Sequence, residues 1–222
     1  MLTLHHLNNS RSQRVLWLLE ELGIPYEVQQ YQRDPKTMLA PPALKAIHPL
    51  GKSPIITDGA QTLAETGAIF QHLLAQHEGH SLVPPVGSAA RQRLIYWLHY
   101  AEGSAMPPLL LKLLFTRMPK QAPWFLRPVA RLIANGALSS FIDPQLRLHA
   151  SYWEDQLSPA GWFVGDSFTA ADIMMSFPVE TAKVRGTVGA HTPRLLAYLD
   201  TIHARPAYVR ALERGGPYAY AQ

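Results

Sequence analysis

The sequence predicts an α+β protein in which a small sheet covered by helices precedes a bundle made of helices alone. Two observations support this fold class. The hydrophobic period switches repeatedly over the first eighty residues, and no strand pattern follows the stretch rich in proline and glycine after them. We therefore expect two domains, at 1–80 and 89–222, joined by a linker at 81–88. A chain of 222 residues is long enough for such domains to bury a core.

Strands and helices alternate in the first domain. Leu2 and Leu4 alternate with polar residues and predict a strand, while apolar residues spaced by three and four from Val15 predict a helix that ends at Gly23. The elements expected next are a strand at 26–31, a short helix at 42–47, strands at 54–57 and 61–64 around an Asp58-Gly59 turn, and a helix near 69–74.

The second domain carries only helical periodicity. The expected helices open near Leu94 and then run over 124–141, 144–157, 170–184, 193–203 and 206–213. One start is specified by a capping box, in which Thr169 and Asp172 satisfy each other's backbone N–H groups. These signals concern folding and carry no chemistry.

The chain contains no cysteine, which excludes disulfides, thiolate metal sites and redox chemistry on protein sulfur. Any thiol chemistry must therefore use sulfur that arrives with a ligand. His77 and His80 have the spacing of a helical metal pair but lack a third ligand, so we expect no metal. No nucleotide-binding loop or nucleic-acid-binding fold is evident, and we expect no nucleic-acid partner.

The charge distribution is uneven. The net charge is +4, and no acidic residue lies between Glu102 and Asp143, where five basic residues fall: Lys112, Arg117, Lys120, Arg127 and Arg131. Such a run is typical of the solvated face of a helix pair. A wall that attracts an anionic ligand and a surface that rests on a membrane are the alternatives.

The longest apolar stretch covers only residues 109–115 and includes Lys112, far short of the roughly 20 residues needed to span a bilayer. The chain also begins without the basic flank and apolar run of a signal peptide. We therefore expect a soluble, cytoplasmic protein with no stable membrane insertion.

Four stretches carry a resemblance to a known family: NNSRSQRVLW at 8–17, HPLGKSPIITDG at 48–59, LAETGAI at 63–69 and GDSFTAADI at 165–173. Together they resemble the glutathione transferases, and more narrowly the serine-type members close to the fungal and bacterial Gtt-like group. The resemblance implies a thioredoxin-like first domain with a mixed four-stranded sheet, an all-helical second domain, a homodimer, and glutathione as co-substrate.

Ser10 is the expected catalytic residue. As a residue pattern, Ser10 with Gln13 also fits an ordinary capping box. The resemblance instead implies that the Ser10 hydroxyl faces the glutathione sulfur, with Asn9 in support and Ser12 or Asn8 left to cap the helix. Lowering a thiol pKa of about 8.5 by two units takes about 2.7 kcal/mol. A hydrogen bond to an anion supplies about 1.5–3 kcal/mol and a helix N-terminus about 0.3–1 kcal/mol.

The resemblance also implies the residues that bind glutathione. Pro54 matches a cis-proline, and the backbone of Ser53 before it would pair with the cysteinyl part of the tripeptide. Lys52 would meet the glycyl carboxylate, although it also fits a plain solvated lysine. Glu65 and Thr66 would hold the γ-glutamyl ammonium and carboxylate at a helix N-terminus.

The expected activity is that of a glutathione S-transferase in detoxification, which holds glutathione as thiolate for attack on a small hydrophobic electrophile or a hydroperoxide. A glutathione peroxidase side activity would follow from the second substrate. Tyr100 and Met106 are candidate walls of the acceptor site, but aromatic and Met side chains at helical spacing are also ordinary core. A non-catalytic protein that sequesters hydrophobic ligands and a glutathione-dependent disulfide reductase are the alternatives.

Overall fold

The computed structural model describes residues 1–221 of the chain. Its single sheet contains β1 (Leu2–Leu7), β2 (Tyr26–Tyr31), β3 (Ile55–Asp58) and β4 (Gln61–Ala64) in the order β2-β1-β3-β4. β2 runs parallel to β1, and β3 and β4 continue the sheet as an antiparallel hairpin. The expected mixed four-stranded sheet is therefore confirmed, with β1 at its centre and the turn at Asp58-Gly59 between the last two strands.

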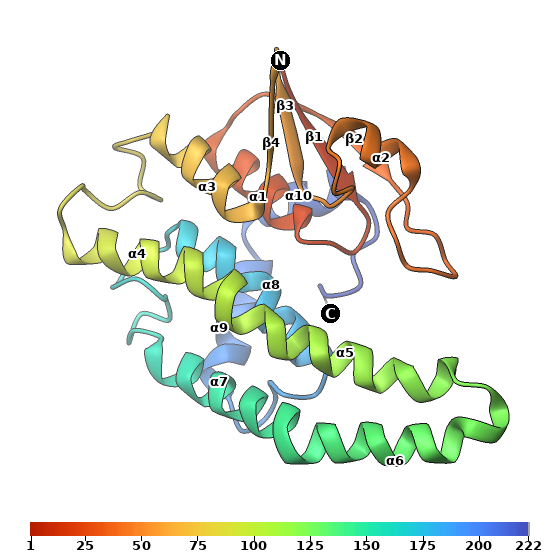
Figure 1. The fold of residues 1–222 in the computed structure, drawn as a ribbon. Helices are drawn as coiled ribbons and strands as arrows, with labels where there is room; N and C mark the ends of the chain where they lie inside the picture. The colour runs from red at the N-terminus through yellow and green to blue at the C-terminus, as the bar shows by residue number, and fades with distance from the viewer. Residues whose placement is uncertain (222) are drawn as a thin grey trace.

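Helices cover both faces of the sheet. Figure 1 shows α1 (Ser12–Leu22) and α3 (Thr66–Ala75) on one side and the short α2 (Pro42–Ile47) on the other. α1 is buried continuously from Ser12 to Leu19, because it is covered by the sheet on one side and by helices of the second half on the other. Gly23 ends it in the left-handed conformation, at φ 65°, as the sequence predicts.

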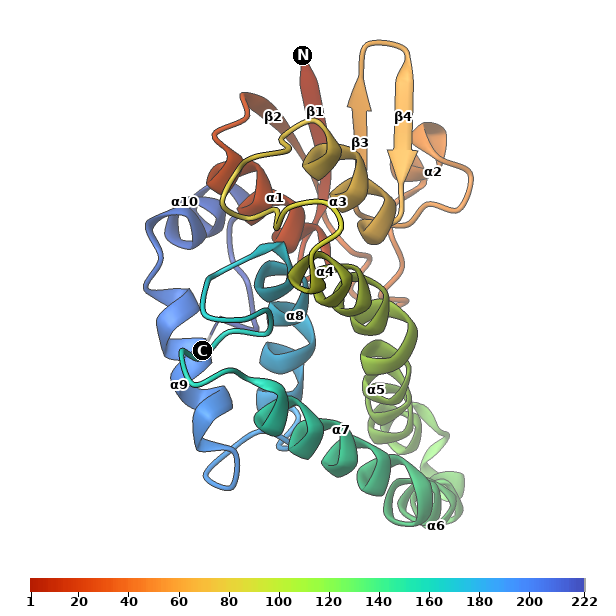
Figure 2. The ribbon, with the colours of Figure 1, turned by 90° about the vertical axis from the view of Figure 1, so that its left-hand side faces the viewer.

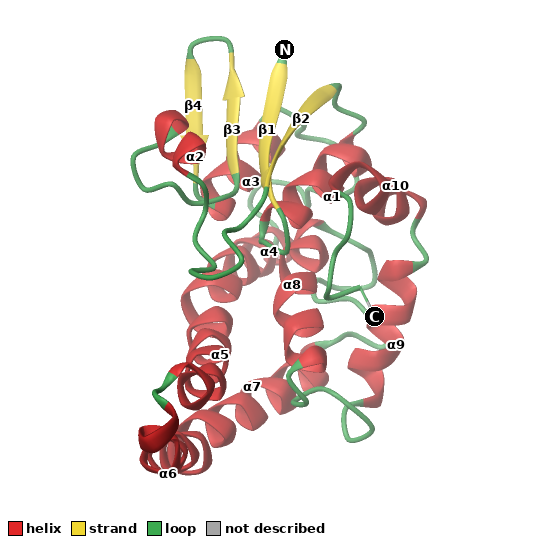
Figure 3. Ribbon diagram, turned by 90° about the vertical axis from the view of Figure 1, so that its right-hand side faces the viewer, coloured by secondary structure: helices red, strands yellow, loops and turns green. Residues whose placement is uncertain are grey.

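Within the described residues, the elements of the second half of the chain are helices alone, and most of them lie below the sheet in Figure 3. Its elements are α4 (Ala89–Tyr100), the π-helical turn η1 (Ala101–Ala105), α5 (Met106–Gln121), the 3₁₀ turn η2 (Trp124–Leu126), α6 (Arg127–Ala137), the π-helical turn η3 (Leu138–Ile142), α7 (Asp143–Gln156), α8 (Ala170–Val184), α9 (Pro193–His203) and α10 (Pro206–Gly215). The sequence does not predict the two π-helical turns, which join α4 to α5 and α6 to α7.

α8 forms the centre of this helical half and is buried from Ala170 to Ala182. The predicted capping box begins it: the Asp172 carboxylate accepts from the Thr169 N–H at 2.8 Å, and the Thr169 hydroxyl accepts from a first-turn N–H. α10 then returns to pack against α1 (Figure 2). One continuous hydrophobic core therefore joins the sheet to the helices.

No helix in the described part of the chain is long and apolar enough to cross a bilayer.

Candidate functional site

Ser10 lies in the turn between β1 and α1 and is only 4% exposed. Its Oγ is 2.7 Å from the Ser12 Oγ and accepts a hydrogen bond from the Ser12 backbone N–H at 3.2 Å. Ser10 thus satisfies a first-turn N–H of α1 itself. The expectation that Ser12 or Asn8 caps this helix is wrong, because the Ser12 and Asn8 side chains bond elsewhere.

Ser12 bonds to a buried histidine on β1. Its Oγ lies 2.9 Å from Nδ1 of His6, whose ring also donates an N–H to the backbone carbonyl of Gly215. Burial lowers the pKa of His6 to about 4, so the ring is neutral near pH 7 and carries one proton. Since that proton is directed to Gly215, Nδ1 accepts from the Ser12 hydroxyl. The Ser12 oxygen is then left as an acceptor for Ser10.

The end of α10 packs directly on this chain of groups. A Cβ added at Gly215 would lie 2.7 Å from a methyl group of Leu16 and 3.4 Å from the His6 ring. Only a glycine therefore lets the backbone carbonyl come within reach of His6. The C-terminal part of the chain takes part in the geometry at the start of α1.

The two asparagines before Ser10 fix the turn. The Asn8 side-chain oxygen accepts from the Arg33 backbone N–H at 2.8 Å. Asn9 adopts φ 50°, a conformation that asparagine tolerates, and its side-chain oxygen accepts from the Ala219 N–H at 2.8 Å. A contact between Asn9 and glutathione remains a prediction, and it would use the amide group that Ala219 leaves free.

An ion-pair network links this turn to the helical half. Glu102, in η1, pairs with Arg11 at 2.7 Å and with Arg14, whose side chain is 1% exposed. Arg14 also donates to the backbone carbonyl of Met174 on α8 at 2.8 Å. Burial alone would raise the pKa of Glu102, but Arg14 and Arg11 outweigh it and hold that pKa below its ordinary value. The network therefore stays charged and holds the start of α1 against η1 and α8.

The Ser53-Pro54 peptide bond is cis, as the sequence resemblance implies. The Ser53 hydroxyl donates to the backbone carbonyl of His5 at 3.0 Å and accepts from the Leu7 N–H at 3.3 Å. Its side chain thus ties the loop before β3 to the end of β1, three residues from Ser10. Lys52 is exposed and has no hydrogen-bond or ion-pair partner among the described residues.

Glu65 and Thr66 lie at the start of α3, where the sequence places them. Glu65 has φ 73° and ψ 122°, a conformation that non-glycine residues rarely adopt. Its carboxylate is exposed and no residue of the described chain bonds to it. Thr66 is buried as the first residue of the helix. Strained backbone that carries an unpaired charge at a helix N-terminus is typical of a ligand-binding position.

Tyr100 and Met106, the candidates for the acceptor site, differ in their surroundings. The Tyr100 hydroxyl accepts from the Trp153 indole N–H at 3.0 Å and also bonds His149, so its side chain is engaged with α7. Tyr100 stands two residues before Glu102 and therefore on the opposite side of the helix. Met106 is buried after η1. An acceptor role for either residue stays a prediction.

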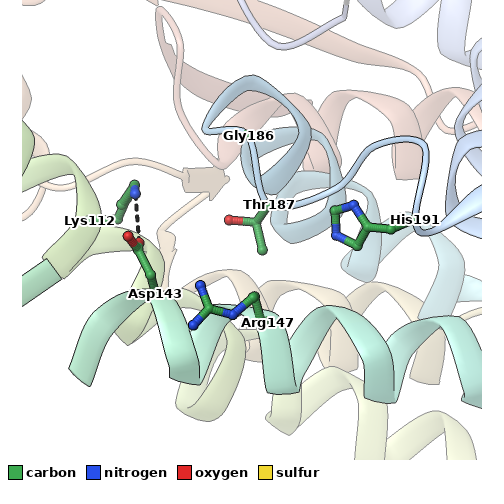
Figure 4. A pocket seen from close by; sticks show the side chains of 6 residues that line it. All are labelled: Lys112, Asp143, Arg147, Gly186, Thr187 and His191. Carbon is green, nitrogen blue, oxygen red and sulfur yellow. Dashed lines mark hydrogen bonds and ion pairs between the residues drawn. The ribbon is translucent and has the colours of Figure 1, made fainter. Parts of the chain in front are cut away.

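Two cavities lie away from the candidate glutathione residues. Figure 4 shows one of about 160 Å³ in the helical half, lined by Lys112, Asp143, Arg147, Gly186, Thr187 and His191. A second, of about 200 Å³, is lined by residues of α4 and α7. Neither is lined by a candidate glutathione residue. Within residues 1–221, no group of three or more His, Asp or Glu side chains could hold a metal ion.

Known proteins match both halves of this arrangement. The family model of the glutathione S-transferase N-terminal domain matches residues 10–76, and that of the C-terminal domain matches residues 130–212. The chain belongs to the glutathione S-transferase family. Its first domain is the thioredoxin-like domain of that family, and glutathione is its co-substrate.

Relatives of this transferase include proteins of fungi and of a bacterium. Glutathione S-transferase 3 of Schizosaccharomyces pombe is 38% identical over 96% of this chain and 88% of its own. Glutathione S-transferase 1 of Saccharomyces cerevisiae is 33% identical over 96% and 95% of the two chains. The crystal structure of a glutathione S-transferase from Actinobacillus pleuropneumoniae superposes with a TM-score of 0.83 at 34% identity, over 100% of this chain and 96% of that one. The expected resemblance is confirmed.

Sequence reasoning about this transferase missed several residues around Ser10. Nothing in the sequence pattern singles out His6, and Glu102 enters it only as the last acidic residue before the basic stretch. Arg14 lies inside a quoted motif, yet nothing in the motif indicates that it is buried. The contact of Ala219 with Asn9 joins residues 210 positions apart. The glycine pair at 215–216 was the one local signal of close packing near the C-terminus.

Proposed function

We propose that this transferase uses the Ser10 hydroxyl to hold the sulfur of glutathione as a thiolate, which then attacks an electrophilic hydrophobic compound or a hydroperoxide. The observation that carries the proposal is the arrangement of hydrogen-bonding groups around Ser10. Its oxygen accepts the Ser12 backbone N–H at 3.2 Å, and among the described residues the Ser12 oxygen, 2.7 Å away, is the side-chain partner of its hydroxyl group. The Ser10 hydroxyl can rotate so that its proton points to a glutathione sulfur bound beside the turn between β1 and α1.

The energies suffice for this role. The hydrogen bond from Ser10 to an anionic sulfur is worth about 1.5–3 kcal/mol. The first turn of α1 points its N–H groups toward the same place and adds about 0.3–1 kcal/mol. Together they lower a thiol pKa by roughly two units, without any protein thiol or histidine base.

Residues from three separate segments would each bind a different part of glutathione. Glu65 would accept from the α-ammonium of the γ-glutamyl end, and Thr66 at the start of α3 would donate to its carboxylate. The Ser53 backbone before Pro54 would pair with the cysteinyl unit, since the Ser53 side chain is already engaged with β1. Lys52 would meet the glycyl carboxylate, and the Asn9 amide would support the sulfur end.

Oligomeric state, cellular location and the acceptor site complete the proposed function. We infer that the protein is a cytoplasmic homodimer active in detoxification, and that apolar residues near the turn, with Met106 among the candidates, contribute to the acceptor site. Light scattering on a sizing column tests the dimer. Several acceptor classes remain compatible with one bound thiolate: aryl halides, epoxides, hydroperoxides and mixed disulfides.

The decisive experiment combines Ser10→Ala with glutathione binding and turnover. We expect the variant to stay on a glutathione column, to show a raised pKa of bound glutathione in an ultraviolet titration, and to turn over an aryl halide at least about tenfold more slowly. An unchanged titration would reject the role of Ser10. Failure of the parent protein to bind the column would favour ligand sequestration, and a disulfide rate above all others would favour a reductase.

A further inference from the structure

The helical half carries a projecting arm, defined as α5, η2 and α6 (residues 106–137). Figure 1 shows α5 and α6 running side by side away from the rest of the molecule. The end of the arm exposes six large apolar side chains, which we call the arm tip: Trp124, Phe125, Leu126, Val129, Leu132 and Ile133. Their exposed fractions run from 47% for Leu126 to 79% for Trp124. Large apolar side chains exposed together on one segment indicate a binding partner.

The larger apolar side chains of α6 lie on its exposed face. Ala130, Ala134 and Ala137, spaced by four and three residues, form its more buried face. Val129, Leu132 and Ile133 share the same helical spacing on the exposed face. A helix whose only role is to cover α5 would have the reverse distribution, with small residues outside and large ones inside. The outward apolar stripe is therefore available to something beyond this chain.

The arm is also basic. Arg117, Lys120, Arg127 and Arg131 lie on it, and no acidic residue occurs from 103 to 142. None of these four cations has an ion-pair partner among residues 1–221. Lys112, nearer the body, is by contrast paired with Asp143 at 2.6 Å. Uncompensated positive charge thus surrounds the exposed apolar residues.

We propose that the arm tip binds the surface of an anionic lipid bilayer. Trp124, Phe125 and the apolar stripe of α6 would enter the boundary between headgroups and acyl chains, while the cations of the arm contact anionic headgroups. Large apolar residues beside Arg and Lys on a helix that is too short to span are typical of such interfacial binding. The arm rests on the bilayer without crossing it, as the lengths of its helices require.

A second copy of this chain fits the arm less well. A symmetric dimer through two arms would place the same surface on both sides of the interface. Because the arm carries cations and no carboxylate, such pairing would bring like charges together, whereas anionic headgroups neutralise them.

Trp124 provides a reporter of binding. The indoles of Trp17, Trp97 and Trp153 are fully buried, and Trp162 is partly buried outside the arm. A change in polarity at the arm tip is therefore reported chiefly by Trp124. The full-length protein would be sedimented with vesicles of phosphatidylcholine, with and without phosphatidylglycerol, while its emission is recorded. We expect binding to the anionic vesicles with a shift of emission to shorter wavelength, and binding that weakens as salt is raised.

Two variants of the arm test the two contributions. Trp124→Ser with Phe125→Ser removes apolar insertion, and Arg127→Gln with Arg131→Gln removes charge; each should weaken vesicle binding at least about tenfold. The matched controls are Leu148→Ser, which removes an exposed leucine from α7, and Lys36→Gln, which removes an exposed cation from a loop. Both controls should bind as the parent does. Retention on glutathione and cooperative unfolding show that every variant is folded.

Three results would overturn the proposal. The first is that the parent protein does not bind anionic vesicles at physiological ionic strength. The second is that the arm variants bind as tightly as the controls. The third is that the arm variants lose a dimer that the parent forms, while the parent does not bind vesicles. The last result would identify the arm tip as an interface between copies.

Discussion

The Oγ atoms of Ser10 and Ser12 lie 2.7 Å apart, and both residues are buried at the start of α1. Their roles differ because of what lies behind them. Ser12 is within 2.9 Å of Nδ1 of His6 and donates its proton there, so it has none to offer a sulfur. Within residues 1–221, the Ser10 hydroxyl has the Ser12 oxygen as its one acceptor. Two serines that look interchangeable in the sequence are therefore distinguished by one histidine.

Ser12→Ala should accordingly separate stability from chemistry. We expect a loss of about 1 kcal/mol in the free energy of unfolding, from the buried hydrogen bonds, with the pKa of bound glutathione changed by a few tenths at most. Ser10→Ala should raise that pKa by about 1–2 units. Urea unfolding and ultraviolet titration measure the two quantities. An equal rise of the pKa in Ser12→Ala would make Ser12 the donor.

His6 gives the stability a pH dependence. Its pKa is about 4 in the folded protein, because burial disfavours the charged ring, against 6.5 when unfolded. Between these values the unfolded chain binds a proton that the folded chain does not, so the free energy of unfolding falls as pH falls from 6.5 to 4. The contribution is about 3 kcal/mol over this window, at about 1.36 kcal/mol per pKa unit.

His6→Asn tests this contribution, since the Asn side-chain oxygen can still accept from Ser12 but does not titrate. Unfolding in urea at several pH values should show a flatter profile between pH 6.5 and 4 than the parent protein shows. His99→Asn, which replaces an exposed histidine on α4, serves as the control and should keep the parent slope. Parallel profiles for His6→Asn and the parent would contradict the assignment.

Much of the fold could be predicted from the sequence because its causes are local. The Thr169–Asp172 capping box and the Asp58-Gly59 turn each act within four residues, and both occur as expected. Gly23 ends α1 for the same kind of reason. The mixed order of the strands came from family resemblance, since no local pattern specifies which strand lies at the centre.

The surroundings of Ser10 could be predicted only in part. The motif placed Ser10 correctly at the turn, but which serine caps α1 depends on His6 and on the carbonyl of Gly215. These contacts join the first strand to the last helix, so they appear only once the chain has folded. Burial of Arg14 likewise depends on α8 and Glu102, which no spacing within α1 encodes.

Arg14 and Glu102 should couple strongly. Arg14 is fully buried, so Glu102→Gln leaves its charge without a full partner, and Arg14→Met leaves the carboxylate with Arg11 alone. We expect each single change to cost about 3–5 kcal/mol of unfolding free energy, and the double variant to cost clearly less than their sum. Arg11→Met, at a 39% exposed side chain, should cost under about 1 kcal/mol. Additive single effects would argue against the coupling.

Replacing Glu65 with glycine should raise the stability of the protein and weaken its binding of glutathione. At φ 73° its backbone is strained by about 1–3 kcal/mol, which glycine would relieve at a cost of about 0.5–1 kcal/mol in chain freedom. Glu65→Gly should therefore raise the free energy of unfolding, by up to about 2.5 kcal/mol. It should also weaken glutathione binding about tenfold or more, because the ammonium loses a charged hydrogen bond. Thermal unfolding and calorimetric titration measure the two effects.

Glu65→Gln separates the side chain from the backbone in the same test. Glutamine keeps a β-carbon, so the strained backbone remains and stability should not rise, while the lost charge should still weaken glutathione binding. If Glu65→Gly bound glutathione as tightly as the parent, the carboxylate would have no part in the site. If Glu65→Gly were less stable than the parent, the backbone at residue 65 would carry no strain. A glutamate at this position would then need no explanation from glutathione binding.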